Sequence, residues 1–360
     1  MKIQSSVIPQ NIVPDGAKRI VIMDNNNEFV GSLSIDNISP PRDLGTMLYS
    51  VGVVSDIHIF ESEYSSNTER IADSQADFER ALKYFSNNVN ILCACGDLGE
   101  YNQALAKYME IRNLNKGSML VYEAIGNHEH FIYPSGTEGI LSNDQVKEIL
   151  GHPIYYTVSN QADSDLNYYC DSIGDDVFIF CGAVKWSSVF NDESFNWLTT
   201  ILESNKDKRC FLFMHGHLES ADHIYCGDST DVLTFEMLSS YKTRFIELLK
   251  KYPNVLYFHG HTHAMLEMQN YTQMLDEPRP ANYDYALGCH SIHVPSLSMS
   301  RDISSGSRED LVSTSEGWLM EVYENYVILR GLDFSNGTTD SNGVYKPAFI
   351  PIATYCLKTI

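Results

Sequence analysis

The sequence predicts an α/β fold in which short apolar strands alternate with amphipathic helices. Buried-strand patterns at residues 49–56 and 88–97 flank a segment, residues 70–88, whose apolar side chains recur with the period of a helix. Beyond Tyr283, helical patterns become scarce and strand patterns dominate. We therefore expect an alternating α/β core that is completed by antiparallel strands near the C-terminus.

An N-terminal β-hairpin appendage, residues 1–46, is expected to precede one larger domain, residues 47–360. In the appendage, the apolar runs KRIVIM and FVGSLSI surround the polar turn DNNNE, and ISPPRD then breaks the chain. In the larger domain, loops rich in Ser, Gly, Asn and Asp are predicted at 301–317 and 335–347. Its further helices are predicted at 101–114, 192–205 and 233–252, and its further strands at 118–127, 168–170, 175–184, 209–216, 254–260, 317–334 and 348–358.

The composition argues against several classes of protein. A formal net charge of -22 over 360 residues disfavours binding to nucleic acid or to an anionic membrane. No segment approaches the ~20 apolar residues of a membrane span, and the N-terminus lacks the apolar region of a signal peptide. The cysteines are spread along the chain and several lie within apolar runs, which favours reduced core thiols. We therefore expect a cytoplasmic protein, and the sequence does not indicate its oligomeric state.

Polar residues of the kinds that bind metal ions follow five of the predicted strands. Open α/β sheets bind ligands outside the carboxyl ends of their strands, so these residues should converge on one edge. Glycines precede three of the groups (Gly96, Gly126 and Gly260), where they allow the backbone to turn sharply away from the strand. In chain order the polar residues are Asp56, His58, Asp97, Asn127, His128, His215, His261 and His263.

The types of these side chains favour a site for two metal ions. Aspartate, asparagine and histidine supply mixed oxygen and nitrogen ligands, and no cysteine directly follows these strands, so a structural zinc–thiolate site is not expected. Such a set is too large for one tetrahedral ion but suits two ions that share a carboxylate. Two ions at ~3.5–4 Å can hold a phosphoryl group between them and deprotonate a water at neutral pH.

The motifs DIH, GDLGE, GNHE, MHGH and GHTH, in this order, resemble those of the calcineurin-like metallophosphoesterase superfamily. The resemblance spans residues 56–263 and implies two mixed β-sheets packed as a sandwich and flanked by helices, a four-layer αββα arrangement. It also implies hydrolysis of phosphate mono- or diesters at a dinuclear metal centre, with a bridging hydroxide as the nucleophile. Such a centre takes two divalent or trivalent ions, of which Mn, Fe and Zn are the expected ones.

The resemblance further implies a role for each motif residue. Asp97 would bridge the two ions, and His128 would donate a hydrogen bond to the phosphoryl oxygens or a proton to the leaving group. Glu100 lies where some members carry the acid that orients this histidine, although an acid at a helix start is the competing explanation. In the fourth motif, His217 is the alternative to the histidine that directly follows the strand. The first ion would be held by Asp56, His58 and His263, and the second by Asn127, His215 and His261.

The segment HSIHVPSLSMSR, residues 290–301, is expected to form a loop near the site. Within it, His290 or Arg301 could contact a substrate. Tyr64, in the loop that follows the first motif, could stack on a nucleoside or an aromatic leaving group. Ordinary loop packing is the competing explanation for all three.

One departure from the superfamily pattern bears on the substrate. Tyr101 follows Glu100, where the phosphoprotein phosphatases of the superfamily carry an arginine that binds phosphate. With the acidic composition, this difference favours the bacterial-type phosphodiesterase and phosphatase branch, which acts on small phosphate esters.

Two other functions stay open as alternatives. A catalytically silent scaffold of this fold would typically lack the Asn–His pair or the bridging acid, and both are present here. A nuclease of the superfamily would usually present a basic surface to nucleic acid, and the acidic composition of this chain disfavours that alternative.

Overall fold

The computed structural model describes residues 44–61, 68–132, 168–185, 188–217, 241–266, 289–301 and 312–358, and it defines four short strands outside these ranges. The beginning of the helix expected at 233–252 lies outside the described residues. Among the helices of the described ranges, none is long and apolar enough to cross a membrane.

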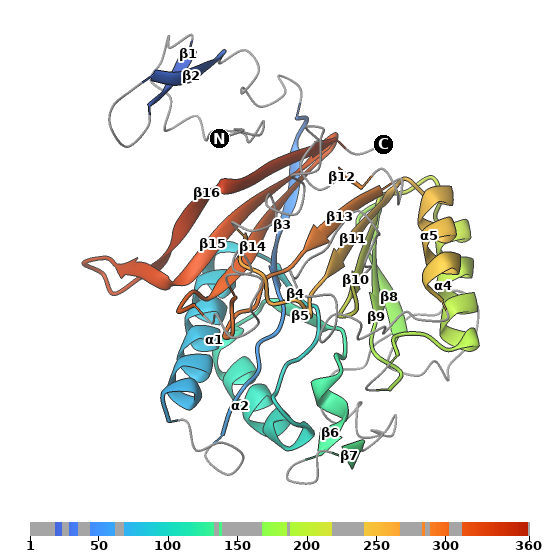
Figure 1. Cartoon of the computed structure of the whole chain (residues 1–360), viewed down its shortest axis with the longest axis horizontal. Coiled ribbons are helices and arrows are strands. Elements are labelled where there is room, and N and C mark those ends of the chain that lie inside the picture. The colour runs from blue at the N-terminus through green and yellow to red at the C-terminus, as the bar shows by residue number, and fades with distance from the viewer. Residues whose placement is uncertain are drawn as a thin grey trace.

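Two mixed β-sheets of six strands each form the centre of the protein (Figure 1). The first sheet contains β3 (Met47–Val54), β4 (Ile91–Ala94), β5 (Leu120–Glu123), β14 (Glu316–Tyr323), β15 (Tyr326–Thr339) and β16 (Tyr345–Lys358). Their spatial order is β16-β15-β14-β3-β4-β5. β3, β4 and β5 are parallel, whereas β14, β15 and β16 run antiparallel to their neighbours. The C-terminal strands thus extend the sheet that the first α/β units begin.

The second sheet contains β8 (Tyr168–Ile173), β9 (Asp176–Cys181), β10 (Cys210–Met214), β11 (Val255–His259), β12 (Tyr283–Asp284) and β13 (Cys289–His293). Their order is β12-β13-β11-β10-β9-β8. The four inner strands are parallel, and the two edge strands, β8 and β12, are antiparallel.

Alternating side chains build one core between the sheets and one core behind each sheet. Along β10, Phe211 and Phe213 pack between the two sheets, while Leu212 and Met214 pack on the opposite face, against helices. Two helices cover each outer face (Figure 1): α1 (Thr68–Asn88) and α2 (Leu105–Asn115) cover the first sheet, and α4 (Asp192–Ser204) and α5 (Lys242–Lys251) cover the second. The predicted αββα arrangement is therefore confirmed.

Two expected loops contain strands. The loop expected to begin at residue 290 starts as strand β13, which pairs in parallel with β11 and places His290 opposite Leu256. The loop expected at 335–347 is partly strand, because β15 continues to Thr339 and pairs there with Tyr345 of β16. Side chains at the tip of this hairpin are mostly exposed, so their polarity reflects contact with water rather than an unpaired backbone.

Near the N-terminus, β1 (Arg19–Met23) and β2 (Phe29–Ser34) pair as an antiparallel hairpin. The other residues up to position 43 lie outside the described ranges. The division of the chain at residue 46 into an appendage and a larger domain stays a prediction.

Candidate metal centre

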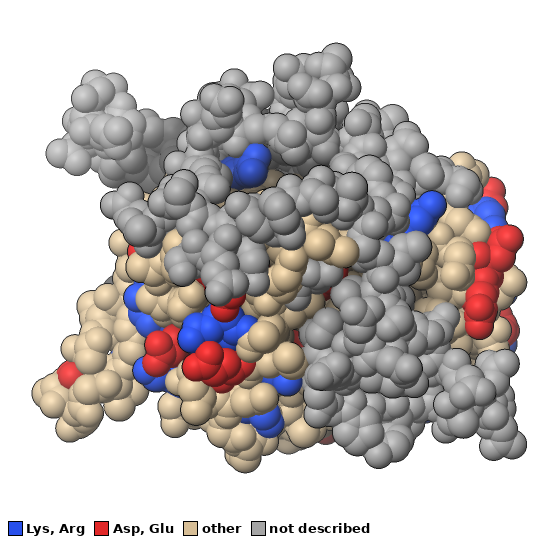
Figure 2. Space-filling view, turned by 90° about the horizontal axis from the view of Figure 1, so that it is seen from below, with Lys and Arg blue, Asp and Glu red and all other residues tan. Residues whose placement is uncertain are grey.

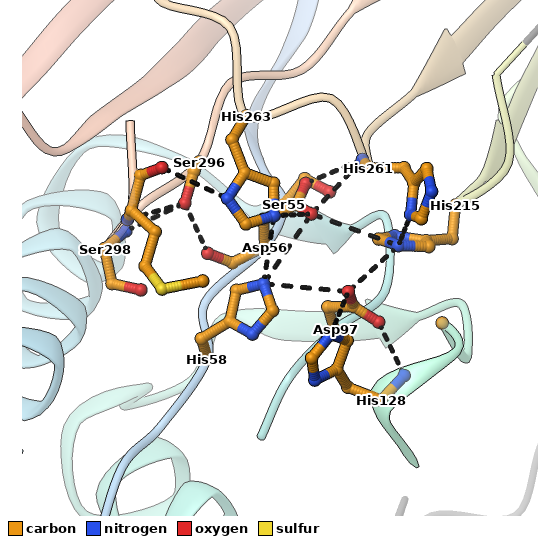
Figure 3. Close-up of polar contacts among 12 residues, drawn as sticks. Ser55, Asp56, His58, Asp97, His128, His215, His261, His263, Ser296 and Ser298 are labelled. Atoms are coloured by element: carbon orange, nitrogen blue, oxygen red, sulfur yellow. Dashed lines mark hydrogen bonds and ion pairs between the residues drawn. The ribbon is translucent and has the colours of Figure 1, made fainter. Parts of the chain in front are cut away.

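The loops that follow the predicted strands meet beside the carboxyl ends of both sheets (Figure 3). Backbone hydrogen bonds hold neighbouring loops together. In the first sheet, N of His58 donates to O of Asp97 at 2.9 Å, and in the second, N of Gly260 donates to O of His215 at 3.2 Å. The resulting network of contacts contains seven of the predicted residues: Asp56, His58, Asp97, His128, His215, His261 and His263.

The backbone is left-handed at five of these positions. The φ angles are 50° at Asp56, 44° at His58, 51° at Asp97, 75° at His261 and 58° at His263. In the described part of the chain, no other non-glycine residue has a positive φ. This conformation costs an L-residue free energy and tends to occur where function requires it. The strain is therefore concentrated on the residues predicted to bind metal.

Two glycines are required by close approach of the loops. A Cβ on Gly260 would overlap Oγ of Ser55 and a carboxylate oxygen of Asp56. A Cβ on Gly126 would overlap the carboxylate and the backbone N of Asp97. Only glycine lets these backbones come so near to the aspartates.

One group of potential metal ligands comprises Asp56, His58, Asp97 and His263. Nε2 of His263 lies 3.0 Å from Oδ1 of Asp56. Nε2 of His58 lies 3.2 Å from Nε2 of His263 and 3.6 Å from Oδ2 of Asp97. All four side chains are buried, so their donor atoms face each other across a space shielded from bulk water.

A second group comprises Asp97, His215 and His261. Nε2 of His215 lies 3.0 Å from Oδ2 of Asp97 and 3.1 Å from Nδ1 of His261. Asn127 follows β5 in the loop beside this group, and its buried Oδ1 accepts no hydrogen bond from the described residues. A buried amide oxygen left without a donor is the state expected of a metal ligand. Asp97 is the one residue common to these two groups, and a third group of potential ligands, His58, Glu100 and His128, shares His58 with the first.

The hydrogen bonds of the outer ring nitrogens fix which nitrogen faces the centre. Nδ1 of His263 lies 3.1 Å from O of Met299, and Nδ1 of His215 lies 2.9 Å from O of Cys95. A carbonyl only accepts hydrogen bonds, so each Nδ1 carries a proton and Nε2 is the ring atom that faces the centre. Nδ1 of His58 faces the Glu100 carboxylate at 2.9 Å, with the same consequence. Nε2 of His58 and Nε2 of His263 lie 3.2 Å apart, so a cation, either a proton or a metal ion, can be shared between them. These residues therefore fit a metal ion.

The charges of the centre attract cations. Burial raises the pKa of Asp97, but the neighbouring His215 outweighs it and holds that pKa far below its usual value. Burial lowers the pKa of His58, yet its hydrogen bonds to Asp56 and Glu100 raise that pKa to about 10. In the same way, the two aspartates raise the pKa of His215 to about 9 against the effect of its burial. Ionised carboxylates thus draw positive charge to the ring nitrogens, either as protons or as metal ions.

His128 lies at the edge of the centre and is more open than the other rings. Its side chain is 24% exposed, against 0% for His58, and its Nε2 lies 3.8 Å from Oδ2 of Asp97. Its backbone N donates to Oδ1 of Asp97 at 3.0 Å. Its Nδ1 lies 2.9 Å from the backbone O of Glu100 and 3.5 Å from the carboxylate of that residue. An Nδ1 proton held by the carbonyl leaves Nε2 directed at the centre.

Two supporting residues have no counterpart among the sequence-based predictions. The buried Glu129 carboxylate accepts hydrogen bonds from N of Gly126 at 2.6 Å and N of Leu98 at 2.7 Å, and it thereby joins the loops after β4 and β5. Burial and the charge of Asp97 raise its pKa to about 7. Oγ of Ser296 donates to O of Asp56 at 2.8 Å. The acid in GNHE was a visible signal for Glu129, whereas nothing in the serine-rich segment distinguishes Ser296 from its neighbours.

The remaining candidates lie around the centre. Nε2 of His215 reaches Asp97, while His217 stacks on His261 with ring centroids 5.6 Å apart. N of Arg301 donates to O of His263 at 2.8 Å, so its backbone supports that residue. His290 lies on β13 and Tyr64 lies outside the described residues, so their contact with substrate stays a prediction.

Two mixed sheets in an αββα sandwich, with a buried Asp/His cluster beyond the strand ends, define a metallophosphoesterase fold. The family model for calcineurin-like phosphoesterases matches residues 49–265, which include all the motifs, and the chain belongs to this family.

Solved structures of similar fold include a dimetal phosphatase from Danio rerio, with a TM-score of 0.53 and 12% identity over 88% of this chain and 100% of that one. A purple acid phosphatase from yellow lupin (Lupinus luteus) seeds has a TM-score of 0.54 and 11% identity, over 94% of this chain and 59% of that one. At these identities the likeness concerns the fold alone. No curated protein matches the sequence.

Proposed function

We propose that the protein hydrolyses phosphate mono- or diesters with two metal ions held at the centre described above. The observation that carries the proposal is the position of Asp97, whose carboxylate belongs both to the group with Asp56, His58 and His263 and to the group with His215 and His261. A pair of metal ions roughly 3.5–4 Å apart would require a carboxylate that is shared in this way.

The surrounding residues divide into two sets about Asp97. We assign Asp56, His58 and His263 to one ion. We assign Asn127, His215 and His261 to the other, and the buried Oδ1 of Asn127 supports this assignment. When bound, the ions would supply a water nucleophile of lowered pKa and would neutralise the phosphoryl oxygens.

His128 is suited to act on the leaving group. Its Nδ1 is held by the backbone O of Glu100 at 2.9 Å, and its exposed edge allows a substrate to reach Nε2. Nε2 would donate a hydrogen bond to a phosphoryl oxygen or a proton to the departing alcohol, and positioned donors of this kind contribute about 10²–10⁴-fold. The reaction then needs no covalent enzyme intermediate.

A small substrate is the better fit to the surface charge. On the face shown in Figure 2, basic and acidic side chains of the described residues stand beside one another. On α1 and α2, Lys83 pairs with Glu79 and Lys107 pairs with Glu110. Cations already neutralised by neighbours add little attraction for a nucleic-acid backbone. We therefore propose a small phosphate ester rather than a nucleic acid as the substrate.

The test is a screen of the full chain, reconstituted with Mn²⁺, against p-nitrophenyl phosphate and bis(p-nitrophenyl) phosphate. Metal analysis is carried out on the same sample, and a His128→Ala variant provides the background rate. We expect two ions per chain and turnover of at least one ester. Two bound ions with no turnover of either ester above the His128→Ala rate would refute the hydrolase proposal and favour the scaffold alternative.

A further inference from the structure

We propose that Glu100 is a positioning residue for His58: its carboxylate sets the orientation and tautomer of this ligand, while its backbone carbonyl holds His128. The inference rests on the proposed function, because it assumes that His58 binds one of the two ions. It differs from the role expected of this acid, which was to orient His128 through its carboxylate.

The distances separate the two roles. Oε2 of Glu100 lies 2.9 Å from Nδ1 of His58 and 3.5 Å from Nδ1 of His128. The shorter contact is a hydrogen bond, whereas 3.5 Å is too long for a strong one. The backbone O of Glu100, in contrast, lies 2.9 Å from Nδ1 of His128. One residue thus contacts both rings, but through different atoms.

The loops that carry the two residues are fixed to each other. N of Glu100 donates to O of Ile59 at 3.2 Å, and N of Ile59 donates to O of Leu98 at 3.1 Å. Ile59 and Gly99 form a parallel bridge between these bonds. These bonds hold the backbone of Glu100 beside the loop that carries His58.

His58 has a different kind of partner from His215 and His263. Nδ1 of His215 and Nδ1 of His263 are each held by a backbone carbonyl, whereas Nδ1 of His58 is held by a charged side chain. A carboxylate increases the donor strength of the imidazole and adds negative charge near the ion. Only one of the two ions would benefit, so the two halves of the centre should differ in their dependence on Glu100.

The experiment is a Mn²⁺ titration of the full chain by equilibrium dialysis with metal analysis, comparing wild type, Glu100→Gln and Glu100→Ala. Glutamine keeps an oxygen acceptor but removes the charge, and alanine removes both. We expect one ion to bind ~10–100-fold more weakly in Glu100→Gln, and still more weakly in Glu100→Ala, while the other ion binds as in wild type. Circular dichroism on the same samples identifies any variant that has not folded.

Turnover at saturating Mn²⁺ tests the second half of the proposal. The backbone carbonyl remains in both variants, so kcat should return to within a few-fold of wild type, unlike that of His128→Ala. Unchanged affinity for both ions, or a kcat at saturating metal as low as that of His128→Ala, would overturn the proposal. The binding readout needs no catalysis, so a wild-type protein that binds two ions but hydrolyses neither ester would refute the proposed function and leave the role of Glu100 measurable.

Discussion

Nε2 of His215 lies 3.0 Å from Oδ2 of Asp97, although the two residues follow strands of different sheets (Figure 3). Asp97 comes after β4 of the first sheet and His215 after β10 of the second. Their contact therefore joins the carboxyl edges of the two sheets. A metal centre at this junction would be completed only when both halves of the sandwich are in place.

Replacing Asp97 with alanine should remove both metal ions. The carboxylate belongs to both groups of ligands, and its loss leaves each ion one ligand short and one negative charge fewer. Metal analysis after reconstitution with Mn²⁺ should then show little bound metal, and hydrolysis should fall to background. Retention of a full complement of metal by a folded Asp97→Ala protein would mean that this carboxylate is not the bridge.

Replacing His128 with alanine should separate metal binding from turnover. The ring nitrogens of His128 face a backbone carbonyl and the open edge of the centre, so metal content should stay close to that of wild type. Turnover should fall by ~10²–10⁴-fold, because the donor to the leaving group is lost. If the metals were lost from this variant, His128 would have to be counted among the ligands.

Removing metal should lower the thermal stability of the protein. The backbone is left-handed at five positions of the centre, and Nε2 of His58 lies 3.2 Å from Nε2 of His263, close enough for one ion to join them. Ions that bind the folded state stabilise it by mass action. Calorimetry should show a lower Tm after chelation by EDTA and recovery on adding excess Mn²⁺. Mg²⁺ at the same concentration controls for general ionic effects.

The stability of the protein should also depend on pH through Asp77 of α1. Burial raises the pKa of this carboxyl from 3.8 to about 6, although its ion pair with Arg80 opposes the shift. A group whose pKa is raised in the folded state stabilises that state below its unfolded pKa. This stabilisation is lost as the pH rises through the folded-state pKa. Each pKa unit corresponds to about 1.4 kcal/mol, so the loss between pH 4 and pH 8 reaches at most about 3 kcal/mol.

An Asp77→Asn variant tests this dependence, because asparagine resembles the protonated acid and does not titrate. Relative to wild type, the variant should gain stability as the pH is raised from 4 to 8, as measured by Tm. Asp192→Asn on α4 is a matched control, since Asp192 is exposed and its pKa is lowered rather than raised. A difference in Tm between Asp77→Asn and wild type that does not change with pH would contradict the prediction.

The positions of the strand-end residues could be predicted because each follows an apolar run that defines its strand. Asp97 after NILCACG and His261 after VLYFHG are examples, and parallel strands bring such ends together. The supports of these residues could not be predicted in the same way. Met299 and Cys95 act through backbone carbonyls, which every residue carries, so their side chains give no sign of the role.

The partner of the Glu100 carboxylate is a further feature that the sequence could not predict. Its distance of three residues from Asp97 places it near both His58 and His128, and the spacing alone does not select between them. The choice depends on how the loop after β4 packs against the loop after β3.

Strand β13 was not predicted for a related reason. Its sequence, CHSIH, lacks a continuous apolar run, and its pairing with β11 depends on contacts remote in the chain.

The central claim, that two ions share Asp97, is tested most directly by the electron paramagnetic resonance spectrum of the wild-type protein reconstituted with Mn²⁺. Two ions bridged by one carboxylate at roughly 3.5–4 Å should give the spectrum of an exchange-coupled pair, at about two Mn per chain. One ion per chain, or two ions with the spectra of isolated Mn²⁺, would contradict it.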